Sequence, residues 1–586
     1  MTQASKVNGN RGRMLVALAA IAAAGAGVAA LPAAATATTY AWNGSGTSWA
    51  SSTSWTPNGL PGSADTASFN LGGSQTVDLN GNQAADEISV GSGTLTIQGG
   101  SGSYNLALGS SSGGNIIYYS QGAGSPITIG SATPGEAVNV NLAAVNGNQT
   151  IVDDSTSALT FENDVSGTAA TNNITILNVA TNSSSSGAVY FNGVLSDGAA
   201  GGLLSLSLGV PASVIYLNGA NTFTGGISIY DTVNVASLSD YGVASAIGAR
   251  TASQDTNQVG PGSIGLYFSG GTLQYTGSTA QSTDRQIRLT AESTNTIDAS
   301  GSNSSATISF TYTGTNTNLY NAPGPRTLNL VGSNTGRNTF SIGLTDQASN
   351  GGQTSLVKAG AGTWVLNNPS GGNTYSGATS VNAGTLIVDS AIDSSPFTVA
   401  SGATLAGDGS VGTLTASSGG ILSPGDGSNG STMDATGGTA LANGGILDFA
   451  LGSPNVAGGT AGSSLLKTTT LSLGTGITVN IATGAGFGPG TYSLLDYTGA
   501  LTDNSSGFSG WTASGLPIGD TYAFSLGSDQ GTPSVQLTIS AIPEPATLGL
   551  MAAGGLGILL RPRKRRGKGR PGGDVGSASR DEAGTQ

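Results

Sequence analysis

Between residues 38 and 540 the chain repeats short segments in which polar and apolar residues alternate. Each segment begins with a glycine turn and continues as Thr-Leu-x-apolar, the two-residue period of a half-buried β-strand. Proline is sparse, and no window has the period of an amphipathic helix. The pattern therefore predicts an all-β solenoid with about 22 residues in each coil. The clearest segments are "GSGTLTIQG" from Gly91, "GGTLQY" from Gly270, "AGTLIV" from Ala383, "GATLAG" from Gly402 and "VGTLTA" from Val411.

The N-terminal segment departs from this pattern. The basic residues Lys6, Arg11 and Arg13 precede an apolar run at residues 14–31, which is followed by small residues. This order of regions predicts a secretory signal peptide over residues 1–37, with an Ala-x-Ala cleavage site ending at Ala35 or Ala37. An uncleaved N-terminal anchor is the alternative. The expected partners of a signal peptide are the secretory translocon and signal peptidase.

A second apolar run, from Ala546 to Leu560, lies near the C-terminus. As a helix its 15 residues would measure about 22 Å, less than the ~30 Å of a bilayer core, although local thinning and snorkelling could accommodate it. We predict one transmembrane helix over 546–560. A basic cluster follows it at once, which by the positive-inside rule keeps that side in the cytoplasm and residues 38–540 outside. The cluster consists of Arg561, Arg563, Lys564, Arg565 and Arg566.

Pro543, Glu544 and Pro545 stand directly before this helix. The order Pro-Glu-Pro, apolar helix and basic cluster over residues 541–566 resembles a PEP-CTERM sorting signal. The resemblance implies recognition by an exosortase-type membrane enzyme, cleavage at or near Pro543–Pro545, and release or attachment at the cell surface. One departure is a polar segment at 567–586, predicted as a disordered cytoplasmic tail. An ordinary single-span anchor is the alternative.

Residues 355–390 form the clearest repeat and resemble the autotransporter-associated β-strand repeat, also called the passenger-associated transport repeat. A partial copy is expected over 217–237, where the segment from Asn221 to Gly225 repeats that from Asn373 to Gly377. The resemblance implies a right-handed parallel β-helix, pectin-lyase-like or passenger-like. The matching residues are Lys358, Gly360, Gly362, Thr363, Leu366, Asn373, Thr374, Tyr375, Gly377, Val381, Gly384, Thr385, Leu386 and Val388.

Charge and composition narrow the functional classes. The body carries seven basic residues against 27 carboxylates, and so lacks the basic stripe of a nucleic-acid-binding protein. The chain contains no cysteine and no histidine, which excludes disulfides and thiolate metal sites and removes the usual general base. We expect no metal and no cofactor.

The body opens with the aromatic residues Trp42, Trp49 and Trp55. Aromatic side chains at the end of a solenoid can seal the open core, and an end cap is one interpretation of these residues. The other is stacking of the three rings against sugars. Residues 440–540 keep the β pattern with longer strands and are predicted to form the C-terminal end of the solenoid and its cap.

No catalytic residue stands out. The close acidic pairs Asp86/Glu87, Asp153/Asp154 and Glu162/Asp164 are expected by chance among so many acids. Arg285 and Arg288 form the one local basic cluster of the body.

These features favour a non-enzymatic, exported bacterial surface or extracellular-matrix protein with a structural or adhesive role. Two alternatives remain: a β-helix polysaccharide lyase or hydrolase, and a carbohydrate-binding surface module. An enzyme of this kind would need several acids on one face of the solenoid beside a basic residue.

Overall fold

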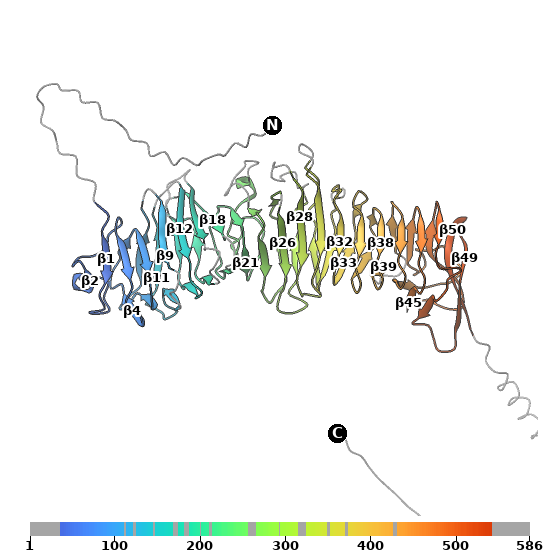
Figure 1. Ribbon diagram of the computed structural model, residues 1–586, viewed down its shortest axis with the longest axis horizontal. Helices are drawn as coiled ribbons and strands as arrows, with labels where there is room; N and C mark the ends of the chain where they lie inside the picture. Colours follow the sequence, from blue (N-terminus) through green and yellow to red (C-terminus); the bar gives the residue numbers. More distant parts are fainter. Residues whose placement is uncertain are drawn as a thin grey trace, which may run out of the picture. The chain divides into compact units, whose positions relative to one another are not determined.

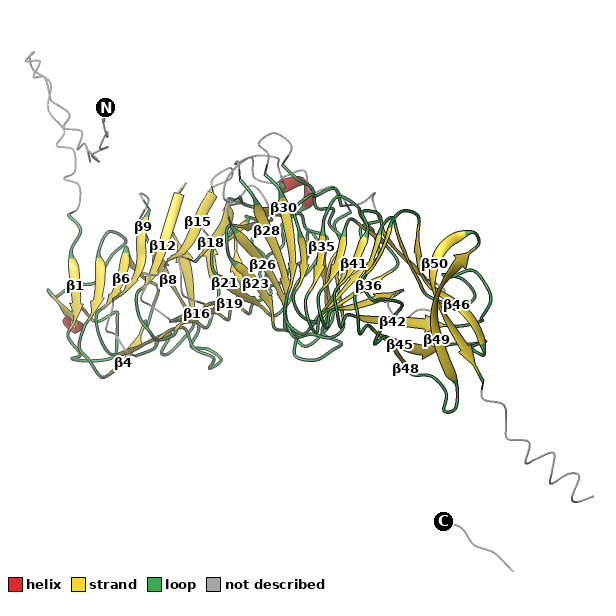
Figure 2. Ribbon diagram, turned by 45° about the vertical axis from the view of Figure 1, so that its right-hand side comes forward, coloured by secondary structure: helices red, strands yellow, loops and turns green. Residues whose placement is uncertain are grey.

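The computed structural model describes residues 36–541 apart from short internal gaps. These are 111–112, 121–124, 144–146, 168–173, 181–186, 200, 210–213, 256–264, 292, 314–323, 348–351, 370–372 and 426–430. Apart from two one-turn 3-10 helices, η1 (Ser52–Ser54) and η2 (Ala252–Gln254), the regular structure of this described part consists of β-strands (Figure 2). The chain divides into two compact units. The first holds the described residues up to Val233 and Gly242–Gln254, and the second holds Asn234–Tyr241, Asp255 and residues 265–541.

In the first unit the chain coils through three parallel sheets. Successive coils add strands to these sheets in turn, and among the described strand pairs of this unit β1–β2 is antiparallel and the others are parallel. The first sheet has the order β2 (Trp55–Thr56), β1 (Thr39–Trp42), β3 (Thr66–Phe69), β6 (Glu87–Val90), β9 (Gly114–Tyr119), β12 (Gly147–Asp153), β15 (Ile174–Ala180), β18 (Leu203–Leu208) and β20 (Ile227–Ile229). The second contains β4 (Ser74–Asp78), β7 (Thr94–Gln98), β10 (Ile127–Ile129), β13 (Leu159–Phe161), β16 (Ala188–Phe191) and β19 (Val214–Leu217). The third contains β5 (Gln83–Ala85), β8 (Tyr104–Leu108), β11 (Val138–Leu142), β14 (Val165–Gly167) and β17 (Leu195–Ser196). Strand β21 (Thr232–Val235) spans the division between the units.

The second unit also consists of successive coils of parallel strands (Figure 1). Its longest ladder contains β23 (Thr272–Tyr275), β26 (Thr294–Ala299), β28 (Arg326–Val331), β30 (Thr354–Lys358), β32 (Thr379–Val381), β35 (Phe397–Val399), β38 (Leu414–Ala416), β41 (Thr439–Leu441), β44 (Leu471–Leu473) and β47 (Leu501–Asp503). A second ladder contains β24 (Gln281–Thr283), β27 (Ile308–Phe310), β29 (Arg337–Phe340), β31 (Thr363–Leu366), β33 (Thr385–Val388), β36 (Thr404–Gly407), β39 (Ile421–Pro424), β42 (Ile446–Leu451), β45 (Thr478–Thr483) and β48 (Thr512–Ser514). A third, called here the C-terminal sheet, has the order β34 (Ala391–Ile392), β37 (Ser410–Val411), β40 (Thr432–Ala435), β43 (Leu465–Thr468), β46 (Gly490–Tyr497), β50 (Thr532–Ser540) and β49 (Thr521–Asp529). The unit also contains the parallel pair β22 (Leu266–Phe268) and β25 (Ile287–Leu289).

The core lies inside the coils because successive side chains of a strand point to opposite faces of its sheet. Strand β15, for example, alternates half-buried and buried positions throughout. Equivalent inward residues of successive coils stack on each other, as the rings of Phe161 and Phe191 do with centroids 5.0 Å apart. The prediction of an all-β parallel solenoid is therefore confirmed.

The coils are not uniform in length. In the repeat, Leu356 pairs with Thr379, 23 residues on, close to the predicted spacing. Elsewhere Phe397 pairs with Leu414 after 17 residues, whereas Thr294 pairs with Thr327 after 33. A parallel ladder fixes only the strands, so each corner can absorb a loop of its own length.

Antiparallel strands occur among the first strands of the first unit and the last strands of the second. In the first unit β2 pairs antiparallel with β1. In the second, β50 pairs antiparallel with both β46 and β49, so the parallel stacking of the C-terminal sheet ends in a hairpin. The edge strand of a sheet exposes unpaired backbone groups. Strand β2 pairs with these groups on β1, and the hairpin of β50 and β49 pairs with those on β46.

Several predicted segments lie outside the described residues. They are nearly all of the signal peptide at 1–37, the sorting motif Pro543, Glu544 and Pro545, the helix at 546–560, the basic cluster from Arg561 to Arg566, and the tail at 567–586. Within the part of the chain that is described, no helix has the length and apolar character needed to cross a membrane.

Candidate functional site

The two copies of the repeat build the same corner, one in each unit. In the first unit the side-chain oxygen of Asn221 accepts a hydrogen bond from the backbone N–H of Leu195, at 2.8 Å. In the second, Asn373 accepts one from the backbone N–H of Leu344, also at 2.8 Å. Leu195 and Leu344 belong to the preceding coil, so each asparagine ties its corner to the coil before it.

An aspartate of that preceding coil holds the fourth residue of each corner. Asp197 accepts hydrogen bonds from the backbone N–H of Thr224 at 3.1 Å and from its hydroxyl at 2.6 Å. Asp346 accepts the same two bonds from Ser376, at 3.0 and 2.6 Å. Charge-assisted hydrogen bonds of this kind are stronger than neutral ones. The aspartates were missed in the sequence, although both occur in a Leu-Ser/Thr-Asp tripeptide about one coil upstream.

The aromatic residue and the glycine of each corner are fixed by packing. Phe223 and Tyr375 are fully buried. A Cβ atom added to Gly225 would overlap the carbonyl oxygen of Leu204, and one added to Gly377 would overlap that of Thr354. The glycine allows the corner to lie directly against the backbone of the preceding coil.

Lys358, the first residue of the repeat motif, is fully buried. Its ammonium group donates hydrogen bonds to the carbonyl oxygens of Ala359, Gly360 and Ala383, at 2.9, 2.8 and 2.9 Å. Ala383 belongs to the next coil, so the lysine connects two successive corners. Burial lowers the pKa of Lys358 from 10.5 to about 8. The lysine of the motif thus has a structural role.

Replacement of this lysine is expected to have a pH-dependent effect. Lys358→Met should destabilise the second unit by about 2 kcal/mol near pH 7, because three buried carbonyl groups lose a charged donor. The ammonium group of Lys358 loses its proton near pH 8 in the folded chain and near pH 10.5 in the unfolded chain. Between these values the unfolded chain binds more protons, so the stability of the wild type rises with pH. The difference in the free energy of unfolding between wild type and variant should therefore widen from pH 7 to 9.5. Hydrogen exchange of residues 354–388 would measure it. A narrowing difference would mean that the carbonyl groups raise the pKa of the lysine.

The three tryptophans at the start of the body form one buried cluster with Phe69. Trp42, Trp49 and Trp55 are 2%, 0% and 0% exposed. The ring of Trp55 meets those of Trp42 and Trp49 edge to face, with centroids 5.0 and 4.9 Å apart, and its indole N–H donates to the carbonyl of Trp49. Stacking against a sugar needs an exposed ring face, so this burial supports the end-cap interpretation.

The acidic pairs noted in the sequence are scattered over the first unit. Asp153 is fully buried and one of its oxygens lacks a hydrogen-bond partner among the described residues. Burial raises its pKa to about 6. Burial, and then the charge of Asp86, raises the pKa of Glu87. The side chain of Glu162 accepts a hydrogen bond from Asn192, and that of Asp164 accepts one from the backbone N–H of Val194.

The predicted basic cluster is also internal. Arg285 and Arg288 are 0% and 3% exposed, and neighbouring Asp284 accepts the backbone N–H of Tyr241 at 2.7 Å. Among the residues with described positions, no group of three or more His, Cys, Asp and Glu is arranged to hold a metal ion. The arginines therefore belong to the core of the second unit.

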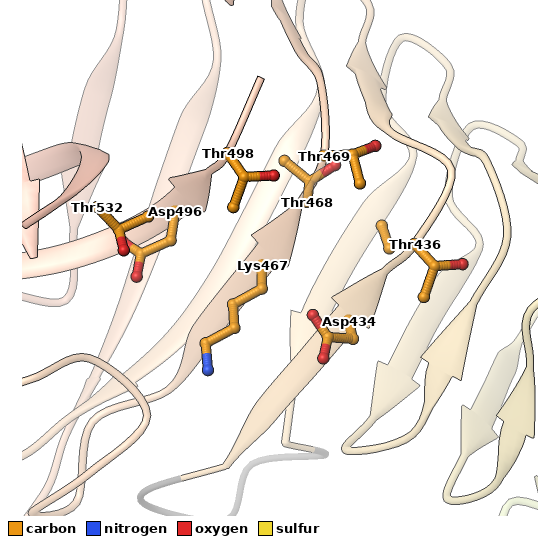
Figure 3. A pocket seen from close by; sticks show the side chains of 9 residues that line it. Asp434, Thr436, Lys467, Thr468, Thr469, Asp496, Thr498 and Thr532 are labelled. Atoms are coloured by element: carbon orange, nitrogen blue, oxygen red, sulfur yellow. The ribbon is translucent and has the colours of Figure 1, made fainter. Parts of the chain in front are cut away.

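A cavity of about 400 Å³ lies on the C-terminal sheet (Figure 3). Strand pairing places Asp434 of β40 beside Lys467 of β43, and Lys467 beside Asp496 of β46. Thr532 of β50 also lines the cavity. Two carboxylates and one ammonium group are thus brought to one face from residues far apart in the sequence.

Asp496 has the most perturbed electrostatics of this cavity. It is 6% exposed, and its Oδ1 atom has no hydrogen-bond partner within the described chain. Burial raises the pKa of Asp496 to about 6; Ser534 and Lys467 lower it, and Asp529 raises it. A perturbed carboxyl group in a cavity with convergent polar groups is typical of a binding site.

Comparison with known families bears out both resemblances. The model of the passenger-associated-transport repeat matches residues 214–231 and 356–388, the two segments that form the equivalent corners. The model of the PEP-CTERM protein-sorting motif matches residues 541–565. The chain thus carries both features.

Among curated proteins the chain is similar to the adhesin BmaC autotransporter of Brucella suis biovar 1 (strain 1330). The two are 28% identical over 343 residues. This match covers 46% of the chain and 9% of the relative, so the chain spans only a small part of that protein's length.

Proposed function

We propose that this chain is an exported bacterial surface or matrix protein with a structural or adhesive role, sorted by an exosortase-type enzyme. The observation that carries the proposal is the sorting-motif match at 541–565, directly after a solenoid with passenger-type repeats. The secretory translocon and signal peptidase would act on residues 1–37. The helix at 546–560 would hold the chain in the inner membrane until processing near Pro543–Pro545.

The solenoid suits such a role for a physical reason. Its backbone hydrogen bonds and stacked side chains recur from coil to coil along the described residues, which would stabilise the body with few charged residues and without disulfides. We take its coils to be right-handed, as the repeat family implies. The similarity to an adhesin supports an adhesive role, and extracellular polysaccharide is the partner we expect.

Surface exposure can be tested on intact cells of the native host. Antibodies raised against the purified chain should label intact and permeabilised cells equally, whereas antibodies against a cytosolic protein should label permeabilised cells alone. Labelling of the chain only after permeabilisation would contradict export to the surface.

A further inference from the structure

The cavity on the C-terminal sheet is lined by two rows of polar side chains, one on neighbouring strands and one just beyond the ends of these strands. The first row is Asp434, Lys467 and Asp496, fixed by the pairing of β40, β43 and β46. The second row is formed by the residues that directly follow the last residue of each of these strands. It consists of Thr436, Thr469 and Thr498, which also line the cavity.

The charged ends of the first row retain unused hydrogen-bonding capacity. Asp434 and Lys467 are exposed, and within the described residues their side chains make no hydrogen bond or ion pair. Asp496 is buried, with one oxygen unpartnered among the described groups. Figure 3 shows the side chain of Lys467 between those of the two aspartates. A ligand in this cavity would thus meet acceptors on both sides of a donor.

The charge pattern selects the kind of ligand. An anion attracted by Lys467 would also meet the carboxylates of Asp434 and Asp496 on the adjoining strands. A cation attracted by the carboxylates would meet the ammonium group between them, at strand spacings of about 4.8 Å. A neutral ligand with many hydroxyl groups avoids both conflicts, because hydroxyls donate to carboxylates and accept from ammonium and threonine groups.

We propose that this cavity binds a neutral saccharide chain, with Asp434, Lys467 and Asp496 as its polar contacts and the threonine row beside them. The inference rests on the proposed function, since it assigns the site at which a surface protein of this kind would bind extracellular polysaccharide. It places glycan binding at the opposite end of the described sequence from Trp42, Trp49 and Trp55.

Calorimetric titration of the full-length chain in detergent micelles tests this site. The probes are hexasaccharides of glucose, mannose, xylose and N-acetylglucosamine, with a galacturonic acid hexasaccharide as the anionic comparison. We expect at least one neutral probe to bind, and Asp434→Asn and Lys467→Gln each to weaken that binding about 10-fold, the loss of one charged hydrogen bond. Both residues are exposed, so both variants should fold.

Asp393→Asn is the matched control, because Asp393 is an exposed carboxylate that does not line the cavity. The affinity of this variant for the neutral probe should stay within about twofold of the wild-type affinity. The proposal would be overturned by any of three results: only the galacturonate probe binds, no probe binds, or the wild type and both cavity variants bind equally. Shortened saccharides after incubation would also overturn it, since a binding site leaves its ligand intact. Surface labelling of cells does not depend on this result, so the two proposals can fail separately.

Discussion

Gly377→Ala is expected to destabilise its coil by about 3 kcal/mol, because the new Cβ would overlap the backbone of the preceding coil. The nearest atoms are the carbonyl oxygen of Thr354 and the hydroxyl of Ser355. Backbone cannot move aside as the end of a flexible side chain can. Hydrogen exchange of the segments 354–358 and 379–388 should therefore accelerate in the variant.

Two comparison variants separate this clash from a general effect of alanine. An added Cβ at Gly488, also in the second unit, meets no atom within 4 Å, so Gly488→Ala should leave exchange unchanged. Gly225→Ala should reproduce the defect in the first unit, since Gly225 lies in the equivalent corner. Unchanged exchange in Gly377→Ala would show that the corner does not depend on the close approach.

Trp55→Ala is expected to cost about 3–5 kcal/mol in the first unit, the range for removal of a fully buried tryptophan. The substitution removes three edge-to-face contacts, with Trp42, Trp49 and Phe69, and the indole hydrogen bond to Trp49. Hydrogen exchange of the backbone amides should accelerate in β1, β2 and β3. Because β2 covers the edge of β1, the variant should also form soluble oligomers, detectable by size-exclusion chromatography.

Leu71→Ala is the control for this variant, because Leu71 lies near the cluster in sequence but is 46% exposed. It should keep wild-type exchange and remain monomeric if the wild type is monomeric. If Trp55→Ala instead keeps wild-type exchange and loses only affinity for saccharides, the tryptophans act in binding and the end-cap interpretation is wrong.

The repeat motif was readable in the sequence because most of its residues act locally. The glycine, the aromatic residue and the asparagine of each corner follow one another at fixed spacing. Asp197 and Asp346, which bind the fourth residue of each corner, were not predictable, since they belong to the preceding coil. Thr224 lies 27 residues after Asp197, and Ser376 lies 30 residues after Asp346, so no single spacing identifies such pairs.

The cavity on the C-terminal sheet was unpredictable for a related reason. Asp434, Lys467 and Asp496 are separated by 33 and 29 residues and become neighbours only through strand register. Register in turn depends on loop lengths that the repeat does not fix. The tryptophans are a different case. The sequence singled them out, but only their packing in the structure could distinguish a buried cluster from an exposed binding surface.

Mass spectrometry of the C-terminal peptide of the surface protein tests the central claim most directly. Wild-type chains recovered from the native host should end at or near Pro543–Pro545 and lack the helix at 546–560. Chains with all three of Pro543, Glu544 and Pro545 replaced by alanine should keep that helix and remain in the membrane fraction. An intact helix and basic cluster on the mature wild-type surface protein would contradict sorting by this motif.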